Sequence, residues 1–134
     1  MEKDKGAAMN YFIPVISFAF MACLPQSALA ARWVELAPWG DWEVRIDAES
    51  LEIDGDYREF WLEYDASQDQ SVNWVTAKVL HKINCNSRQI KTIHGTFYDG
   101  GRKVLDSSTD RYADWEYITP ESNWDDLRVV VCSI

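Results

Sequence analysis

An apolar run near the N-terminus limits how much of this 134-residue chain can fold into a domain. The run covers residues 11–24 and is followed by the small-residue triplet Ala28-Leu29-Ala30. An apolar segment followed by an A-x-A site is typical of a secretory signal peptide. Since a membrane-spanning helix needs about 20 apolar residues, the run is too short to span comfortably. We therefore expect residues 1–30 to be a signal peptide, with cleavage between Ala30 and Ala31.

Alternatives to this leader stay open. The segment before the apolar run carries as many acidic as basic residues, so its positive charge is weak. Translation from Met9 instead of Met1 would remove those charges. An uncleaved anchor is a second alternative. A third is a lipoprotein attached through Cys23, although the bulky Met21 before it fits poorly to a lipidation site.

The expected mature chain, residues 31–134, is acidic. The charges in the leader cancel, so the net charge of −9 falls on the remaining part of the chain. At about 100 residues this part is enough for one domain with a modest core. Its charge repels nucleic-acid phosphates and anionic lipid, so we expect no nucleic-acid partner. We interpret the charge as keeping a secreted domain soluble, with an acidic binding face as the alternative.

Two cysteines, Cys85 and Cys132, remain after the expected processing. In an oxidising compartment an even pair usually forms a disulfide. In the chain-entropy model the bond would stabilise the domain by roughly 4 kcal/mol. A redox or metal-binding pair is the alternative, but it lacks a C-x-x-C spacing and nearby His or Cys ligands.

The alternation of apolar and polar residues predicts a mainly β domain. Expected strands cover residues 33–36, 43–47, 50–53, 57–64, 72–83, 89–98 and 103–105, and residues 115–118 either pair or simply pack. Asp54-Gly55 and Asp99-Gly100-Gly101 are hairpin turn sequences. The polar segment 107–113 is expected to be a loop.

The pattern changes near the C-terminus. Ser122 and, three residues later, an aspartate match a weak capping box. Trp124, Leu127 and Val131 would then lie on one face of a helix. Three consecutive valines favour a strand instead, because β-branched residues are mediocre helix formers. We favour the helix, which would carry Cys132 back to the sheet.

No set of residues in the sequence indicates catalysis, a metal or a cofactor. The two histidines, His81 and His94, make a partial metal site at best, and His81 falls on the apolar face of its strand. A nucleophile motif of the G-x-S-x-G type is absent from the sequence, and carboxylate pairs carry no weight without geometry. Asp54-Gly55-Asp56 resembles a calcium loop only superficially. We expect no catalytic, cofactor-binding or metal-binding residues.

Tryptophan is the main excess in composition, with all seven tryptophans after residue 30. Exposed aromatic residues mark protein or glycan surfaces, whereas buried ones fill a core. Trp33, Trp61 and Trp124 lie in periodic segments, so we expect them in the core. Trp39 and Trp42 flank a turn and are the candidate binding surface.

Several segments between Trp33 and Cys132 occur in a familiar order. They are Trp33, Val44-Arg45-Ile46-Asp47…Ser50-Leu51, Phe60-Trp61-Leu62-Glu63-Tyr64, Lys78…Asn84-Cys85…Arg88, Phe97-Tyr98-Asp99-Gly100-Gly101, Trp115…Ile118-Thr119-Pro120-Glu121-Ser122 and Cys132. Together they resemble the surface-adhesin protein E-like family of Gram-negative bacteria. The resemblance implies one α+β, mainly β domain over residues 31–134. It implies an antiparallel sheet of about six strands with a C-terminal helix tied back by a disulfide.

The expected function follows from these patterns and from the resemblance. The adhesin after which the family is named is an outer-membrane lipoprotein that binds host matrix and serum proteins. We expect a non-catalytic, extracytoplasmic binding module of the bacterial envelope, in the periplasm or at the cell surface. Its expected partner is an envelope or host protein, and a homodimer is compatible with the sequence. A structural envelope protein without a ligand is the alternative, and a small hydrolase would need a pocket joining His81 or His94 to a carboxylate.

Processing after Ala30 is directly testable. N-terminal sequencing of the exported protein should give Ala31-Arg32-Trp33, because signal peptidase cleaves after an A-x-A site. Incorporation of labelled palmitate at Cys23 would contradict this expectation and establish the lipoprotein alternative.

Overall fold

The computed structural model describes residues 31–134. The expected signal peptide of residues 1–30, with Cys23, Ala30 and the alternative starts at Met1 and Met9, lies outside the described residues. Its cleavage and any lipidation therefore remain predictions.

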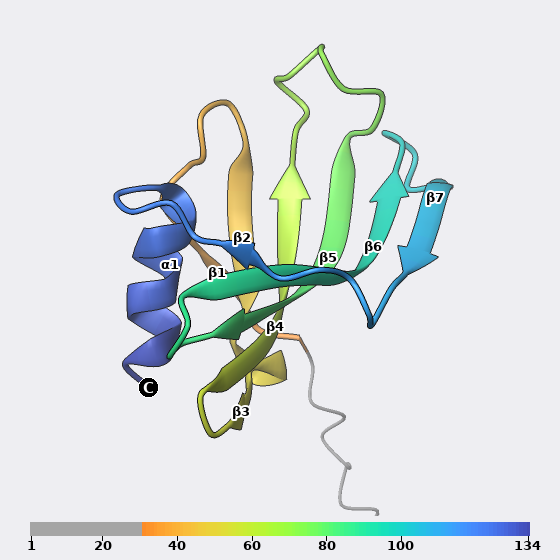
Figure 1. Ribbon diagram of the computed structural model, residues 1–134. Coiled ribbons are helices and arrows are strands. Elements are labelled where there is room, and N and C mark those ends of the chain that lie inside the picture. Colours follow the sequence, from red (N-terminus) through yellow and green to blue (C-terminus); the bar gives the residue numbers. More distant parts are fainter. Residues whose placement is uncertain (1–30) are drawn as a thin grey trace, which may run out of the picture.

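One curved antiparallel sheet with a single helix against one face makes up the domain (Figure 1). Its main path joins β1 (Trp33–Glu35), β2 (Glu43–Asp47), β4 (Tyr57–Asp65), β5 (Thr76–Asn84), β6 (Gln89–Tyr98) and β7 (Val104–Thr109) in that order. β3 (Glu52–Asp54) pairs with β4, β8 (Glu116–Tyr117) pairs with β6, a 3-10 turn covers Ala48–Ser50, and α1 (Asn123–Cys132) closes the chain. The expected antiparallel sheet of about six strands with a C-terminal helix is confirmed, with six strands on the main path and β3 and β8 bringing the total in the described part of the chain to eight. Among residues 31–134, no helix is long and apolar enough to cross a membrane.

Two expected element boundaries are wrong. The segment 107–113 was expected to be a loop, but β7 continues to Thr109 because its backbone pairs with β6 as far as His94. All six side chains of β7 are exposed, so no apolar alternation marks the strand. The expected strand 72–83 begins only at Thr76.

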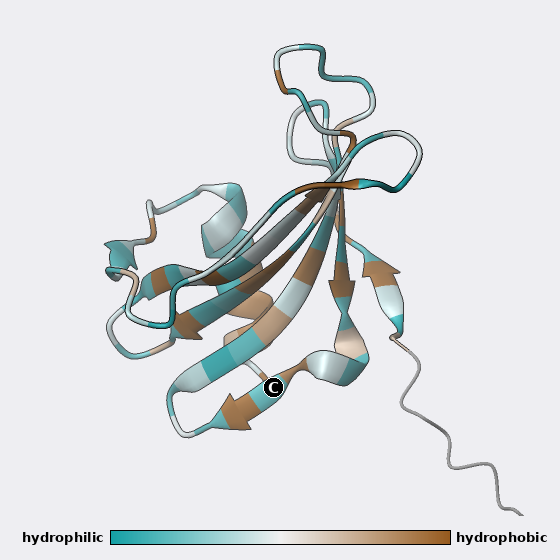
Figure 2. Cartoon of the chain, turned by 90° about the vertical axis from the view of Figure 1, so that its right-hand side faces the viewer, coloured by the Kyte–Doolittle hydropathy of each residue, from teal (hydrophilic) through white to brown (hydrophobic). Residues whose placement is uncertain are grey.

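The core lies between the sheet and α1. Alternate residues of β4 and β5 point to the helix, as the alternation predicted, and we call this side of the sheet the helix face. The best buried side chains are Val44, Phe60, Leu62, Ala77, Ile83 and Val131. Figure 2 shows the same sheet from the side, with hydrophobic and hydrophilic residues alternating along its strands. Each large apolar side chain stabilises the fold by about 1.5–3 kcal/mol when fully buried.

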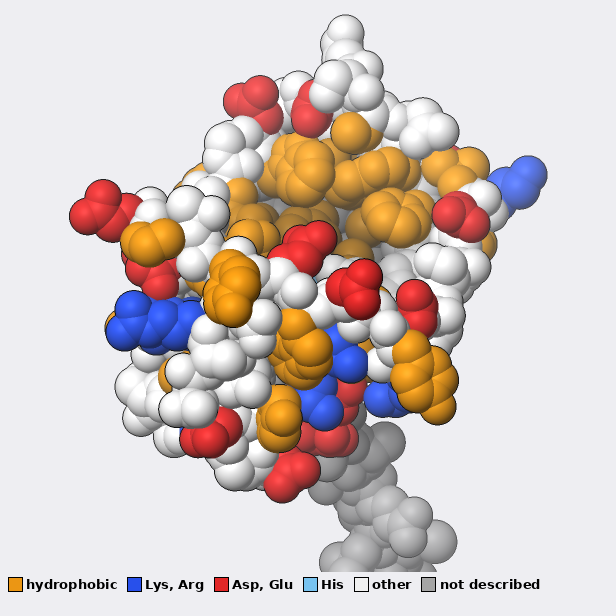
Figure 3. Space-filling model, in the orientation of Figure 1, with side chains coloured by type: hydrophobic (Ala, Val, Ile, Leu, Met, Phe, Trp, Pro, Cys, Tyr) orange, Lys and Arg blue, Asp and Glu red, His pale blue; other side chains and the backbone are white. Residues whose placement is uncertain are grey.

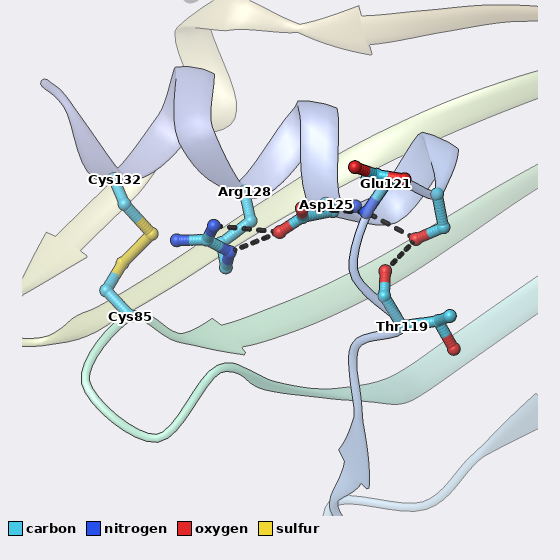
Figure 4. A network of polar contacts seen from close by, with 7 residues as sticks. Cys85, Thr119, Glu121, Asp125, Arg128 and Cys132 are labelled. Atoms are coloured by element: carbon cyan, nitrogen blue, oxygen red, sulfur yellow. Dashed lines mark hydrogen bonds and ion pairs between the residues drawn. A yellow bond between two sulfur atoms is a disulfide. The ribbon is translucent and has the colours of Figure 1, made fainter.

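The helix begins where the capping pattern predicted. The Ser122 hydroxyl accepts a hydrogen bond from the Asp125 amide at 3.2 Å. The Asp125 carboxylate accepts from the Glu121 amide and from Arg128 (Figure 4). These two bonds lower the pKa of Asp125, which keeps a negative charge at the positive end of the helix dipole. The helix prevails over the strand because only Val131 of the three valines is buried, at helical spacing from Leu127.

The other end of α1 is attached to the sheet in two ways. The expected disulfide between Cys85 and Cys132 is confirmed, with the Cα atoms 5.8 Å apart (Figure 4). Beside it lies Arg58, which is 8% exposed. Arg58 occupies a position of β4 where the alternation would otherwise place an apolar side chain. Its Nε donates to the Val131 carbonyl at 3.1 Å, and Nη2 donates to the Ile134 main-chain oxygen at 3.2 Å.

The same guanidinium also holds the β3–β4 hairpin. Its Nη1 donates to the carbonyls of Gly55 and Tyr57 at 2.7 and 2.9 Å. Helix C-terminal carbonyls lack partners within the helix and carry partial negative charge. A single buried cation therefore satisfies the end of α1 and the turn beneath it.

The side of the sheet away from α1, which we call the open face, is polar. One transverse row runs in register across all six strands of the main path. It consists of Glu35, Arg45, Glu63, Lys78, Thr96 and Ser107. Charges alternate along its first four positions, and Arg45 forms an ion pair with Glu63. Opposite charges on neighbouring strands stabilise a sheet, so this row favours the observed register.

Replacing Arg58 by Met should destabilise the domain by about 2–4 kcal/mol, because several buried carbonyls lose their donor. Urea unfolding followed by circular dichroism measures this cost. The matched control is Arg88→Met, which makes the same change at an exposed position and should cost less than about 0.5 kcal/mol. Equal midpoints for the two variants would contradict the assigned role of Arg58.

Candidate functional site

Aromatic side chains converge on the helix face beside α1. Figure 3 shows hydrophobic side chains gathered in a depression in the upper half of the molecule. Six aromatic residues that contact one another on this face come from five separate parts of the chain, and we call them the aromatic hollow. They are Trp39, Trp42, Tyr64, Trp74, Phe97 and Trp124. Tyr64 is buried, and the other five are half-buried against the core.

A tight hairpin carries the two tryptophans that the sequence singled out. Trp39 and Trp42 exchange two backbone hydrogen bonds of 3.0 and 3.2 Å. Gly40 between them has φ +64°, a left-handed conformation that favours glycine. Directly opposed residues of a hairpin place their side chains on the same side. This turn therefore presents both indoles to the hollow.

Each indole of the hairpin is held by further rings. The Trp39 ring lies 4.8 Å from Trp124 between centroids, and the Trp42 ring lies 5.2 Å from Trp74. Both also contact Tyr64, at 5.9 and 5.8 Å. Edge-to-face pairs at these distances add about 0.5–1.5 kcal/mol beyond the buried area. Each indole of the hairpin is thus held in place by contacts with two other aromatic rings.

Asp69 in the β4–β5 loop fixes the edge of the hollow. Its carboxylate accepts a hydrogen bond from the Trp42 Nε1 at 2.8 Å. Hydrogen bonds from Ser71 and from Trp42 lower the pKa of the Asp69 carboxyl. The carboxylate is therefore ionised at neutral pH and orients the Trp42 ring, a contact that sequence reasoning missed because the two residues lie far apart in the chain.

The burial of the tryptophans differs from the expected division into core and surface. All seven are half-buried. Trp33 and Trp61 are not core residues, because their strands turn these side chains to the open face, which no helix covers. Trp124 packs at the base of the hollow, with its ring 4.7 Å from that of His81. Trp39 and Trp42 are partly exposed and also pack against the core, so they combine both roles.

His81 lies beneath the hollow and is 4% exposed. Its Nε2 shares a hydrogen bond of 2.9 Å with the Tyr64 hydroxyl, and its Nδ1 shares one of 3.1 Å with Thr92. Burial lowers the pKa of His81 to about 3 and raises that of Tyr64, so both side chains are neutral at pH 7. His81 is the packed, hydrogen-bonded core histidine that the sequence favoured.

His94 lies on the open face. Its ring nitrogens share hydrogen bonds with the hydroxyls of Thr96 and Thr109, and its ring lies 5.7 Å from that of Trp61. The partners of both histidines are hydroxyl groups, so the carboxylate pairing that a small hydrolase would require has no support here. Within residues 31–134, no three His, Cys, Asp or Glu side chains come together as a metal-binding group.

The fold and its hollow define a class of small, disulfide-tied antiparallel β domains with one C-terminal helix against the sheet. The chain belongs to the surface-adhesin protein E family, whose family model matches residues 33–133. It is therefore an adhesin-like surface protein.

Solved structures share this fold. The structure is similar to crystal form II of Haemophilus influenzae protein E, with a TM-score of 0.50 and 14% identity over 75% of this chain and 96% of that chain. A second structure of Haemophilus influenzae protein E gives a TM-score of 0.49 and 13% identity over 75% of this chain and 93% of that chain. A search of curated proteins gives no match. At 14% identity, the likeness to crystal form II establishes the fold alone.

The burial of His81 predicts a stability that depends on pH. Because the pKa is lowered from 6.5 to about 3 in the folded protein, the unfolded state binds more protons between these values. The contribution of His81 to the free energy of unfolding is fully present above about pH 7 and decreases as the pH drops below 6.5. Unfolding in urea should cost about 2 kcal/mol less at about pH 5 than at about pH 7.5.

Two matched variants distinguish the contribution of His81 to this pH dependence from that of His94. His81→Gln should abolish most of this pH dependence, whereas His94→Gln should keep it. A wild-type protein with the same unfolding free energy at both pH values would contradict the assignment.

Proposed function

We propose that this domain is a non-catalytic binding module of the bacterial envelope that holds a protein partner at the aromatic hollow. One observation carries the proposal. Five partly exposed aromatic rings from distant parts of the chain meet in one depression, where simple core filling would have buried them. Trp and Tyr in half-enclosed pockets are the residues that most often dominate protein–protein affinity.

The chemistry of the hollow favours a particular kind of contact. Its floor is neutral, since His81 and Tyr64 are both uncharged at pH 7. Its rim carries the exposed Asp41 at the hairpin tip and the ionised Asp69. An apolar or aromatic anchor flanked by a basic side chain matches this arrangement. The net charge of −9 would steer a basic partner surface toward the domain.

The proposal places the domain outside the cytoplasm, in the periplasm or at the cell surface. Two observations support export. Residues 1–30 have the pattern of a cleaved leader, and the disulfide requires an oxidising compartment. Family membership supports surface display, with attachment through Cys23 as the less favoured route.

A structural envelope protein without a dedicated ligand is the second candidate. The observation that favours it is that none of the seven tryptophans is fully exposed. On that account the rings of the hollow serve only to brace the hairpin against α1 and the sheet.

Site-specific photocrosslinking separates the two candidates. A photoreactive phenylalanine analogue placed at Asp41 projects from the hairpin tip beside the hollow, and Asp41 has no hydrogen-bonding side-chain partner among residues 31–134. Illumination of living cells should give a discrete protein adduct, identified by mass spectrometry. The control position is Ser108 on β7, which is equally exposed but belongs to the far edge of the sheet.

The adduct at Asp41 should disappear when Trp39 or Trp42 is replaced by Ala, since loss of a hot-spot ring costs about 2 kcal/mol or more in binding, roughly 30-fold. Both variants need a check by circular dichroism, because the rings also pack on the core. Equal labelling at Asp41 and Ser108, or no adduct at either, would favour the structural protein over the binding module.

A further inference from the structure

The open face carries a second concavity, on the side of the sheet opposite the aromatic hollow. It has a volume of ≈ 500 Å³, within the range of about 300–1,000 Å³ of small-molecule sites. The lining residues that matter for its chemistry are Trp33, Glu63, Asp65, Lys78, Tyr98 and Arg102. We propose that this concavity binds a saccharide of one or two rings that carries a carboxylate. The site is on the opposite side of the sheet from the hollow, so the proposal does not rest on the proposed protein partner.

Two cations of the concavity are available to an anionic group. Lys78 Nζ lies 5.7 Å from the centroid of the Trp33 ring and forms no ion pair with any of residues 31–134. The Arg102 side chain is exposed at the β6–β7 turn and likewise has no ionic partner in that part of the chain. Arg45, in contrast, is already paired with Glu63. A carboxylate could therefore bind Lys78 and Arg102 by charge-assisted hydrogen bonds.

The charge of the concavity is opposite to that of the protein. Its lining holds three cations and two carboxylates, while the whole chain has a net charge of −9. Such a local reversal attracts anions to one place on a surface that otherwise repels them. The acidic character that argues against nucleic acid as a partner thus does not exclude a small anion here.

The remaining lining suits a ring covered with hydroxyl groups. Lys78 already lies over the half-buried Trp33 ring, and the part of the ring that it leaves open can attract the C–H groups on one side of a sugar. Glu63 and Asp65 accept hydrogen bonds, and the hydroxyls of Thr76 and Tyr98 both donate and accept. An apolar ligand would leave these groups without hydrogen-bond partners, whereas a saccharide satisfies them.

The orientation of the concavity favours a saccharide over an acidic peptide. Its lining crosses the sheet from β1 to the β6–β7 turn, because Asp65, Thr76 and Tyr98 are cross-strand neighbours. An extended peptide usually adds along the edge of a sheet, where backbone groups are free. A site that runs across the strands offers side chains and no free backbone, which suits a compact ligand.

Nuclear magnetic resonance titration of the purified protein tests the proposal. The probes are digalacturonic acid, glucuronic acid and N-acetylneuraminic acid, with neutral galactobiose and a tetra-aspartate peptide as comparisons. At least one acidic sugar should shift the Trp33 indole signal, which Trp33→Phe assigns. Lys78→Gln and Arg102→Gln should each weaken this binding about fivefold or more.

Two matched controls exclude a general effect of charge. Lys82→Gln changes the same strand and the same face, and Lys103→Gln changes the neighbour of Arg102, but neither residue lines the concavity. Both variants should bind like the wild type. Four results would overturn the proposal: no binding of any acidic sugar, equal binding of galactobiose, equal weakening by the control variants, or binding of tetra-aspartate alone.

Discussion

The attachment of α1 to the sheet is the constraint on which the rest of this structure depends. A helix of ten residues is marginal in water, so it needs tertiary contacts to persist. The Cys85–Cys132 bond holds its last turn, and Arg58 satisfies the carbonyls that the helix leaves without partners. Because both anchors lie at the C-terminal end, the N-terminal end of α1 is positioned by its cap and by Trp124 packing on His81. That end is where the aromatic hollow forms.

Placing one helix on one face gives the two sides of the sheet different chemistry. On the helix face, α1 covers the core but is too short to cover the whole surface, so aromatic rings close the remaining part and stay partly exposed. On the open face, a row of alternating charges favours the observed register. On that face Trp33 lies next to Lys78, and Trp61 lies next to His94 and opposite Leu80 of β5.

The sequence predicted what depends on local pattern and missed what depends on distant partners. Alternation placed Phe60, Leu62 and Tyr64 on one face, and the cap at Ser122 located the start of α1. The end of β7 could not be predicted, because pairing with β6 alone makes it a strand. The role of Arg58 could not be predicted for a similar reason. The role of a charged residue within an apolar alternation cannot be predicted until the fold brings the end of a distant helix beside it. Turn chemistry identified the hairpin tryptophans, but the residues that contact their rings come from three other segments, namely β4, the β4–β5 loop and α1.

The two proposed binding surfaces, one neutral and one charged, also have a physical logic on one acidic domain. At the hollow, burial keeps His81 uncharged, so the rings lie over a floor that neither attracts ions nor changes charge near neutral pH. At the open face the cations stay in water, where exposed charges select by sign and geometry but contribute little net stability. The two proposed sites lie on opposite faces of the sheet and share no lining residue. If both proposals hold, a protein partner and a small acidic ligand can occupy the domain together.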